Sequence, residues 1–379
     1  MAVRPSSDLV VLSHLRWTFV WQRPQHLVSR LAKERRTWFV EEPVASDVAS
    51  PRLRTENHGA VTRVWLEVPA DGHVHVGFDH PCSATYADGV IELLGGRSPD
   101  ATWLYTPMAL EIAAALRPAT LVYDVMDDLA SFRGAPAELR LRHLQALRQA
   151  DVVFTGGRSL HRGVVAHRPH RTHLFPSGVE PEHFAPARAR RPANRATPVA
   201  GYVGVIDERL DLGLVADLAA ALPDWEIRMV GPVVKIDPDS LPQAPNLVYP
   251  GPQAYELLPD VMAGFDVALM PFALNEATRS ISPTKTLEYF AAGLPVVSTR
   301  VPDVVADHRA VVDLEDDGAG FARACRAAKR RDRRARTAEV DAVLRRQTWD
   351  SIATRMSEII ERTATPGLTT VAAATVETA

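Results

Sequence analysis

The stretch SPTKTLEYFAAGLPVVST, residues 282–299, contains the signals of a helix, a stop and a strand in close succession. Ser282 is a suitable N-cap and Pro283 fits the first helical position. Gly293 ends the helix, and the apolar run after it predicts a buried strand. Helical spacing of i, i+3, i+4 and i+7 predicts one buried stripe: Leu287, Phe290, Ala291 and Leu294.

Two charged residues in this helix point to a ligand. Lys285 falls in the first turn, where the partial positive charge of a helix N-terminus makes a cation unfavourable by itself. A bound anion would remove that cost. Glu288 lies one turn further along the same face, and its carboxylate can accept hydrogen bonds from the hydroxyls of a polyol. The alternative is a surface ion pair between the two residues at i, i+3.

Length and composition are those of a globular protein. The 379 residues are 46% hydrophobic and 23% charged, which predicts two domains or more. A formal net charge of −3 excludes a strong overall attraction to nucleic acid or to anionic lipid. Cys82 and Cys325 are too few for a disulfide framework and lack metal-ligand spacing, which favours the cytoplasm.

Targeting signals point the same way. The first residues, MAVRPSSDLVVLSHL, lack the apolar core of a signal peptide. Apolar runs stay well below the roughly 18 residues that a membrane span needs. We therefore expect any membrane contact to be peripheral, at the inner face of the cell membrane.

Short apolar runs alternate with helical patterns along the chain. Strands are expected at 8–13, 36–42, 61–68, 101–106, 119–124, 151–155, 172–176, 198–204, 226–231, 246–251, 266–271, 295–299 and 310–314. Helices are expected at 23–35, 136–149, 157–167, 211–221, 254–263, 283–292 and 318–330. Near-continuous apolar strands between helices predict parallel sheets covered on both faces.

One segment divides this pattern into two halves. PARARRPANRATP, residues 186–198, is rich in Pro, Arg and Ala and predicts a surface linker. We expect an α/β protein of two doubly wound, Rossmann-like domains, residues 1–180 and 181–345, that face a central cleft. Ligands should bind in that cleft, beyond the carboxyl ends of the strands. Residues 364–379 are small and polar and predict a flexible tail.

Motifs in the second half have a characteristic order. FPSGVEPEHF (175–184) precedes GYVGVIDERLDLGLV (201–215), which precedes GPQAYELLPDVMAGFDVALMPF (251–272). Together with the stretch at 282–299, they resemble GT-B glycosyltransferases of the retaining family 4 type. In that resemblance they correspond to the entry into the C-terminal domain, the phosphate loop, the approach to the nucleotide site and the donor helix. WDSIATRMSEII (349–360) is similar to the family's final helix, so residues 346–363 should cross back to the N-terminal domain.

The first half supports the same resemblance. SHLRWTFVWQRPQHLVSRLA (13–32) and YDVMDDLASF (123–132) resemble a bacterial subgroup associated with polysaccharide assembly. The resemblance implies transfer of a sugar from a nucleoside diphosphate-sugar, UDP or GDP first, to a glycan, lipid-linked or small-molecule acceptor with retention. It implies no required cofactor. A sugar-nucleotide epimerase and an inactive nucleotide- or glycan-binding partner remain alternatives, since Ser280 stands where the family usually has a second Glu.

The resemblance also assigns roles at the donor site. Glu288 would bind the ribose. The residues themselves add two candidates for the diphosphate: Lys285 at a helix N-terminus, and Arg209 after the Gly204 turn, whose guanidinium can bind phosphate in bidentate fashion. The alternative for each is a solvated surface cation or a structural salt bridge. Glycine after each of two apolar strands allows a ligand to approach the backbone closely; these residues are Gly204 and Gly231. Hydroxyls of Ser282 and Thr284 can donate to phosphate, although Ser282 can equally cap its helix. The contact with the donor sugar would pass from position 280 to Asn275, Glu276 or Arg279.

Candidate residues in the first half follow strand ends. His14, Arg16 and Arg23 belong to a loop that would enter the cleft and contact donor or acceptor, unless Arg23 only opens the next helix. Asp127 and Asp128 follow another strand, where either carboxylate can orient or deprotonate an acceptor hydroxyl.

We expect no metal. The aspartates of YDVMDD suggest the metal motif of another glycosyltransferase fold, which does not fit two similar α/β halves. His73 and His75 would share one strand face and could ligate zinc, but they lack a third and fourth ligand.

Overall fold

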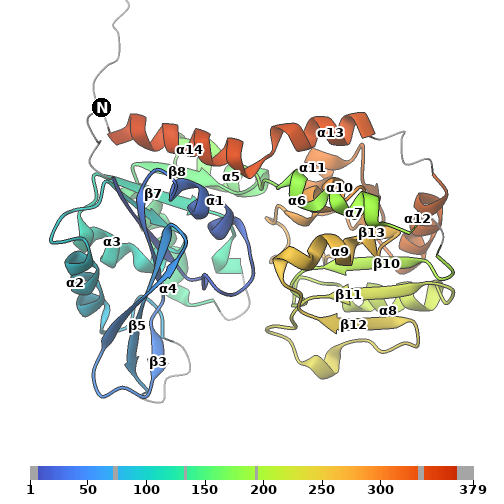
Figure 1. Cartoon of the computed structure of the whole chain (residues 1–379), viewed down its shortest axis with the longest axis horizontal. Coiled ribbons are helices and arrows are strands. Elements are labelled where there is room, and N and C mark those ends of the chain that lie inside the picture. Colours follow the sequence, from blue (N-terminus) through green and yellow to red (C-terminus); the bar gives the residue numbers. More distant parts are fainter. Residues whose placement is uncertain (1–6, 71–75, 132–134, 193–194, 332–336, 365–379) are drawn as a thin grey trace, which may run out of the picture.

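The computed structural model describes residues 7–70, 76–131, 135–192, 195–331 and 337–364. Two α/β lobes lie side by side, as Figure 1 shows. The expected tail beyond residue 364 and the pair His73 and His75 lie outside the described residues. Within the described part of the chain, no helix is both long enough and apolar enough to cross a membrane.

The N-terminal lobe is built on one nine-stranded sheet with the strand order β3-β5-β2-β1-β6-β7-β8-β9 and β4 paired to β5. Its strands are β1 (Asp8–Ser13), β2 (Arg36–Glu41), β3 (Val44–Ser46), β4 (Arg52–His58), β5 (Val61–Pro69), β6 (Ala101–Leu104), β7 (Thr120–Val125), β8 (Val152–Thr155) and β9 (Thr172–Leu174). All pairs along this order are parallel. The helices are α1 (Arg23–Leu31), α2 (Ser83–Leu93), α3 (Leu110–Leu116), α4 (Ala137–Gln149) and α5 (Arg158–Val165).

Alternation along the central strand places this sheet between two cores. In β1, Leu9 and Val11 join the cluster on one face, while Val10 and Leu12 join the cluster on the other. All four side chains are fully buried. From β1 the strand order runs outward in two opposite directions, through β2 on one side and through β6 on the other. The boundary between β1 and β6 is therefore the topological switch point of the lobe.

The C-terminal lobe repeats the plan with six parallel strands in the order β12-β11-β10-β13-β14-β15. Its strands are β10 (Val199–Val203), β11 (Glu226–Val230), β12 (Leu247–Gly251), β13 (Val267–Met270), β14 (Val296–Ser298) and β15 (Asp313–Leu314). The helices are α8 (Leu212–Ala221), α9 (Leu258–Ala263), α10 (Lys285–Ala291), α11 (Pro302–His308) and α12 (Gly318–Arg330). Short 3-10 helices span Pro107–Ala109, Leu129–Ser131, Pro238–Ser240 and Tyr255–Leu257. The predicted α/β class with two parallel sheets is confirmed.

The expected linker is more ordered than its composition suggests. Residues around it form α6 (Pro181–Phe184) and α7 (Pro186–Arg190). Arg188 donates to the Phe290 carbonyl at 3.0 Å. Arg191 donates to the carbonyls of Ala292 and Gly293 at 2.8 and 3.0 Å. These arginines satisfy the last carbonyls of α10, which a helix leaves without partners, so the segment 186–191 is part of the packing of α10.

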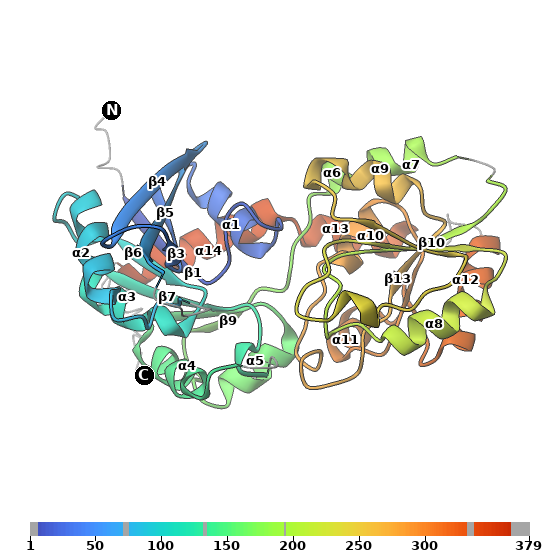
Figure 2. The ribbon, with the colours of Figure 1, turned by 90° about the horizontal axis from the view of Figure 1, so that it is seen from below.

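The last two helices return along the top of both lobes, as Figures 1 and 2 show. They are α13 (Thr337–Arg346) and α14 (Trp349–Ala364). Helix α14 packs against α1, and Trp349, Ile352 and Met356 are buried in a core of the N-terminal lobe.

Candidate functional site

A cavity of about 720 Å³ lies between the lobes. The N-terminal lobe lines it with residues 17–23 and with the loops after β7 and β8, and the C-terminal lobe with the loops after β10, β11, β12 and β13. These are carboxyl ends of parallel strands, where ligands of doubly wound folds bind. The cavity brings together these predicted residues: Arg23, Asp127, Gly204, Arg209, Gly231, Ser282, Thr284, Lys285 and Glu288.

Two glycines make the floor of the cavity on the C-terminal side. Gly231 has a φ of +150°, and a Cβ there would lie 1.8 Å from the carbonyl oxygen of Gly204. Gly204 has a φ of +156°, and its N–H donates to the Val230 carbonyl at 2.9 Å. Only residues without side chains permit this approach of two loops. Both glycines line the cavity, so no side chain of their own stands between their backbone and a ligand.

Helix α10 begins two residues later than its sequence suggests. It starts at Lys285 with Thr284 as N-cap, and no side chain caps it. The predictions that Ser282 caps the helix and that Pro283 takes the first helical position are therefore wrong. The predicted stripe is buried, but so are Thr286, Glu288 and Tyr289. A helix that is buried on all sides cannot be placed by its apolar stripe alone.

Glu288 is a buried carboxylate on the cavity wall. Its side chain is 3% exposed, and Lys285 Nζ donates to Oε2 at 2.7 Å. The i, i+3 pair expected as the alternative reading is present, but it does not lie on an open surface. Both members of the pair line the cavity. The ammonium of Lys285 suits an anionic group of a ligand, and the carboxylate of Glu288 suits its hydroxyl groups.

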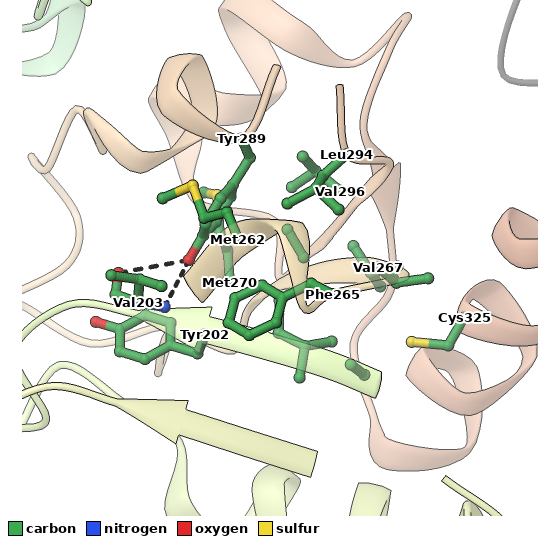
Figure 3. Close-up of a cluster of buried hydrophobic side chains, with 14 of the residues drawn as sticks. Tyr202, Val203, Met262, Phe265, Val267, Met270, Tyr289, Leu294, Val296 and Cys325 are labelled. Atoms are coloured by element: carbon green, nitrogen blue, oxygen red, sulfur yellow. Dashed lines mark hydrogen bonds between the residues drawn. The ribbon is translucent and has the colours of Figure 1, made fainter. Parts of the chain in front are cut away.

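Tyr289 fixes α10 to Val203, the last residue of β10, as Figure 3 shows. The Val203 N–H donates to Tyr289 Oη at 2.8 Å, and the Tyr289 hydroxyl faces the Val203 carbonyl at 3.4 Å. Burial raises the pKa of this fully buried tyrosine well above its ordinary value. The donor-helix candidates Lys285 and Glu288 are thus held in register with the end of β10.

Arg209 also lines the cavity and is bound by Asp207. Its Nη2 donates to Asp207 Oδ2 at 2.7 Å, and its Nε contacts both carboxylate oxygens at 2.9 and 3.0 Å. Burial lowers the pKa of Arg209, but hydrogen bonds and the charge of Asp207 outweigh burial and raise it above its usual value. The guanidinium therefore stays charged.

Asp127 faces this arginine from the N-terminal lobe. Burial raises the pKa of Asp127 to about 6, although the charges of Arg209, Arg23 and Lys235 act in the opposite direction. Asp128 does not line the cavity and accepts from the Ser131 hydroxyl at 2.6 Å. Of the two predicted aspartates, only Asp127 is placed where it can meet a ligand.

Three predicted residues of the first loop have structural partners or little access. Arg23 lines the cavity, but its guanidinium binds both oxygens of Asp124, at 2.9 and 3.0 Å, and the Phe175 carbonyl at 2.9 Å. Arg16 donates to Glu41 and to two backbone carbonyls and does not line the cavity. His14 is not among the residues that line the cavity. Burial and the charge of Lys235 lower its pKa to about 4, and a hydrogen bond with the Tyr105 backbone opposes them.

The expected substitutes for the donor-sugar contact lie outside the cavity lining. Asn275 Nδ2 donates to the Glu208 carbonyl at 3.3 Å. Glu276 and Arg279 form an exposed ion pair at 3.0 Å. Neither the pair nor the amide reaches the cavity in this arrangement of the loop.

Sequence reasoning missed a cluster that joins the lobes beside the cavity. Trp21 stacks on Tyr255 at 6.0 Å, and Trp21 Nε1 donates to His26 Nδ1 at 3.1 Å. Tyr255 Oη donates to Glu180 Oε2 at 2.7 Å, and Arg30 donates to Glu180 Oε1 at 2.8 Å. Trp21, His26 and Tyr255 line the cavity. These side chains fall inside quoted motifs, but only the docking of two lobes reveals their contacts.

Parts of this chain are similar in sequence to known glycosyltransferases. Residues 197–329 match the family model described as glycosyl transferases group 1. A segment of 175 residues is 28% identical to the putative teichuronic acid biosynthesis glycosyltransferase TuaH of Bacillus subtilis (strain 168). That segment covers 43% of this chain and spans 44% of the relative, less than half its length.

Solved structures have a similar fold over nearly the whole chain. HepE of Anabaena, solved in complex with UDP and glucose, has a TM-score of 0.69 at 14% identity over 94% of this chain and 99% of that chain. A UDP-forming α,α-trehalose-phosphate synthase of Burkholderia xenovorans has a TM-score of 0.71 at 14% identity over 95% of this chain and 100% of that chain. At such identities the likeness establishes the fold, which is the two-domain GT-B fold.

Proposed function

We propose that this chain, a GT-B protein with a group 1 glycosyl transferase domain at residues 197–329, transfers a sugar from a nucleoside diphosphate-sugar to an acceptor hydroxyl with retention of configuration. The observation that carries the proposal is the buried Lys285–Glu288 pair on the cavity wall, with Arg209 in the same lining. UDP is the first choice of nucleotide, since structures with this fold were solved with UDP.

The donor would bind by replacing internal partners. Lys285 is paired with Glu288, and Arg209 with Asp207, so the lining cations are neutralised in the ligand-free protein. A diphosphate would draw both cations toward itself, because it carries more charge than either carboxylate. Glu288 would then turn to the ribose hydroxyls. The N–H groups of Gly204 and Gly231 already donate to the Val230 and Gly251 carbonyls, so the two glycines would contribute room for the phosphates beside the backbone and no new donors.

Transfer would take place between the two walls of the cavity. Lys285 and Arg209 would stabilise the charge that develops on the leaving diphosphate. In front-face transfer the leaving phosphate accepts the proton of the acceptor hydroxyl, so no side-chain nucleophile is needed. Asp127 would orient that hydroxyl. Its raised pKa of about 6 allows it to hold or release a proton near neutral pH.

The chain divides these tasks between its lobes in our proposal. Residues 1–180 would bind the acceptor and residues 181–345 the donor, while residues 346–363 return to the first lobe. The acceptor would be a glycan or a lipid-linked or small molecule, in the cytoplasm or at the inner face of the membrane. Likeness to TuaH, whose name concerns teichuronic acid biosynthesis, supports a polysaccharide role.

Thermal unfolding with a panel of nucleoside diphosphates tests the proposal. UDP at about 100 times its Kd should stabilise the protein by about 2.7 kcal/mol. Glu288→Ala and Lys285→Ala should remove most of that gain, whereas Glu182→Ala, an exposed residue of α6, should keep it. Unchanged melting with every nucleoside diphosphate would contradict the proposal. Epimerisation of a donor incubated alone would replace transfer by isomerisation.

A further inference from the structure

Besides the Trp21–Tyr255 stack, the two lobes meet at a second contact. Helix α5 of the N-terminal lobe faces α11 of the C-terminal lobe, as Figure 2 shows. The Ser159 N–H and hydroxyl donate to Asp303 Oδ1 at 3.0 and 2.6 Å. Arg158 pairs with Asp307 of the same helix. This contact takes no part in the chemistry described above.

Asp303 performs the task of an N-cap from the opposite lobe. The N-cap residue of α5 is Gly157, which has no side chain to accept from the first free N–H groups of its helix. The carboxylate of Asp303 accepts from Ser159, the second residue of α5, as an Asp N-cap does within one chain segment. Asp303 is 2% exposed, so a charge without this partner would be costly there.

Gly157 allows the lobes to approach closely at this point. It has an extended φ of −164°, so its backbone places no demand for glycine. Glycine is required there for steric reasons, because a Cβ would lie 2.5 Å from Asp303 Oδ2 and 2.9 Å from the Cβ of Ser282. Both distances are too short for van der Waals contact. The Asp303 carboxylate could rotate away only by giving up its bonds to Ser159, and the Cβ of Ser282 is fixed to its backbone, so a side chain at residue 157 would have to displace the contact between the lobes or the segment at Ser282.

The contact borders the donor site directly. Gly156, Ser177 and Ser282 line the cavity, and the Ser177 hydroxyl donates to the Ser282 carbonyl at 3.3 Å. Ser282 opens the segment that leads to Lys285. A displacement at Gly157 would therefore be transmitted within three residues to the cation proposed for the diphosphate.

We infer that Asp303 and Gly157 form an inter-lobe clasp, in which Asp303 is a positioning residue that sets the distance between the acceptor wall and the donor wall. The effect of the clasp on donor binding rests on the proposed function, whereas the contact between the lobes does not depend on it. Both the clasp and the Trp21–Tyr255 stack join the two lobes, and Gly157 of the clasp lies against Ser282, the first residue of the segment that leads to Lys285.

The test uses the full chain with two matched pairs of variants. Gly157→Ala inserts a methyl group into the clasp, whereas Gly163→Ala adds one to the same helix where no atom lies within 4 Å. Asp303→Ala removes the buried cap, whereas Asp307→Asn weakens an ion pair whose Arg158 partner is 49% exposed. Asp303→Asn keeps an oxygen that can accept from the Ser159 N–H and serves as the rescue variant.

We expect small-angle scattering to give a larger radius of gyration for Gly157→Ala and Asp303→Ala than for wild type and both controls. Asp303→Asn should lie between them. Calorimetric titration should show about tenfold weaker UDP binding in the two clasp variants, or ~1.4 kcal/mol. Two results would each overturn the inference: equal dimensions for Gly157→Ala and Gly163→Ala, or an expanded particle with unchanged UDP affinity. If wild type itself did not bind UDP, the proposed function would fail, and scattering would still decide the clasp.

Discussion

Replacement of Lys285 by Met should reveal how strongly Glu288 depends on its partner. The two side chains differ in exposure, 21% for Lys285 and 3% for Glu288, and they are joined at 2.7 Å. Lys285→Met leaves a buried carboxylate without its cation, which should cost about 2–3 kcal/mol of unfolding free energy. This value lies below the roughly 3–5 kcal/mol for a fully buried pair, because Glu288 borders a cavity that water can enter.

The reverse change should cost less, because the two partners are not equally buried. Glu288→Gln leaves Lys285, whose ammonium can turn toward water in the cavity, and the expected loss is about 1 kcal/mol. The double variant leaves neither charge. It should lose about 1–2 kcal/mol, less than the sum of the single changes, which gives a coupling energy of about 2 kcal/mol.

Urea unfolding of the four proteins measures this coupling. The midpoint should fall most for Lys285→Met and recover when Glu288→Gln is added. If the double variant lost the sum of both single effects to within about 0.5 kcal/mol, the two residues would be energetically independent. The buried pair would then contribute nothing to the site, and the account of donor binding by exchange of partners would be refuted.

Other substitutions follow from the same geometry. Asp127→Asn should gain stability over wild type as pH rises from about 4 to above the folded pKa of about 6, since a raised carboxyl pKa favours the folded state only while the group is protonated. Urea unfolding at both ends of that range should show that the stability of Asp127→Asn relative to wild type rises by about 1–2 kcal/mol, a value reduced for the partial exposure of Asp127. The same stability difference between variant and wild type at both pH values would argue against burial of Asp127. Gly231→Ala should lower stability by about 3 kcal/mol or abolish folding, because its Cβ would meet the carbonyl of Gly204; soluble expression and melting check this, and a wild-type melting temperature would disprove the close approach. Arg191→Ala should lower the melting temperature by the loss of about 1 kcal/mol of helix capping at α10, and Arg190→Ala, an exposed residue, should not.

Apolar runs predicted most strands because parallel strands buried on both faces leave a strong signal. β1, with all its residues buried, is an example. The hairpin of β4 and β5 shows the limit: the β4 sequence RLRTENH is charged and mostly exposed, so no apolar run marks it. Helix α11 was also missed, since seven residues that include Asp303 and His308 give too short a pattern.

The sequence identified candidate site residues, but it could not show which of them face the cavity and which are bound by other side chains. Sequence placed Arg16 and Arg23 in a cleft loop, but it could not show that Glu41 and Asp124 bind them. Likewise, Asp127 and Asp128 are neighbours in sequence, and the turn after β7 sends only Asp127 to the cavity. Partners that decide such questions come from distant parts of the chain.

Apart from the return of the C-terminal helix, which the family resemblance implied, the side-chain contacts between the lobes could not be predicted. The Asp303–Ser159 hydrogen bonds join residues 144 positions apart. Gly157 reads in sequence only as a helix boundary, because its need for space depends on a residue of the other lobe. A docking geometry leaves no local pattern in either partner.

Titration of UDP and 2′,3′-dideoxy-UDP into wild type and Glu288→Ala would test the central claim most directly. If Glu288 binds the ribose hydroxyls, removal of either partner should weaken binding by about tenfold, ~1.4 kcal/mol, and removal of both should cost little more than removal of one. Losses that add independently, or a Glu288→Ala protein that still distinguishes the two nucleotides as wild type does, would contradict it.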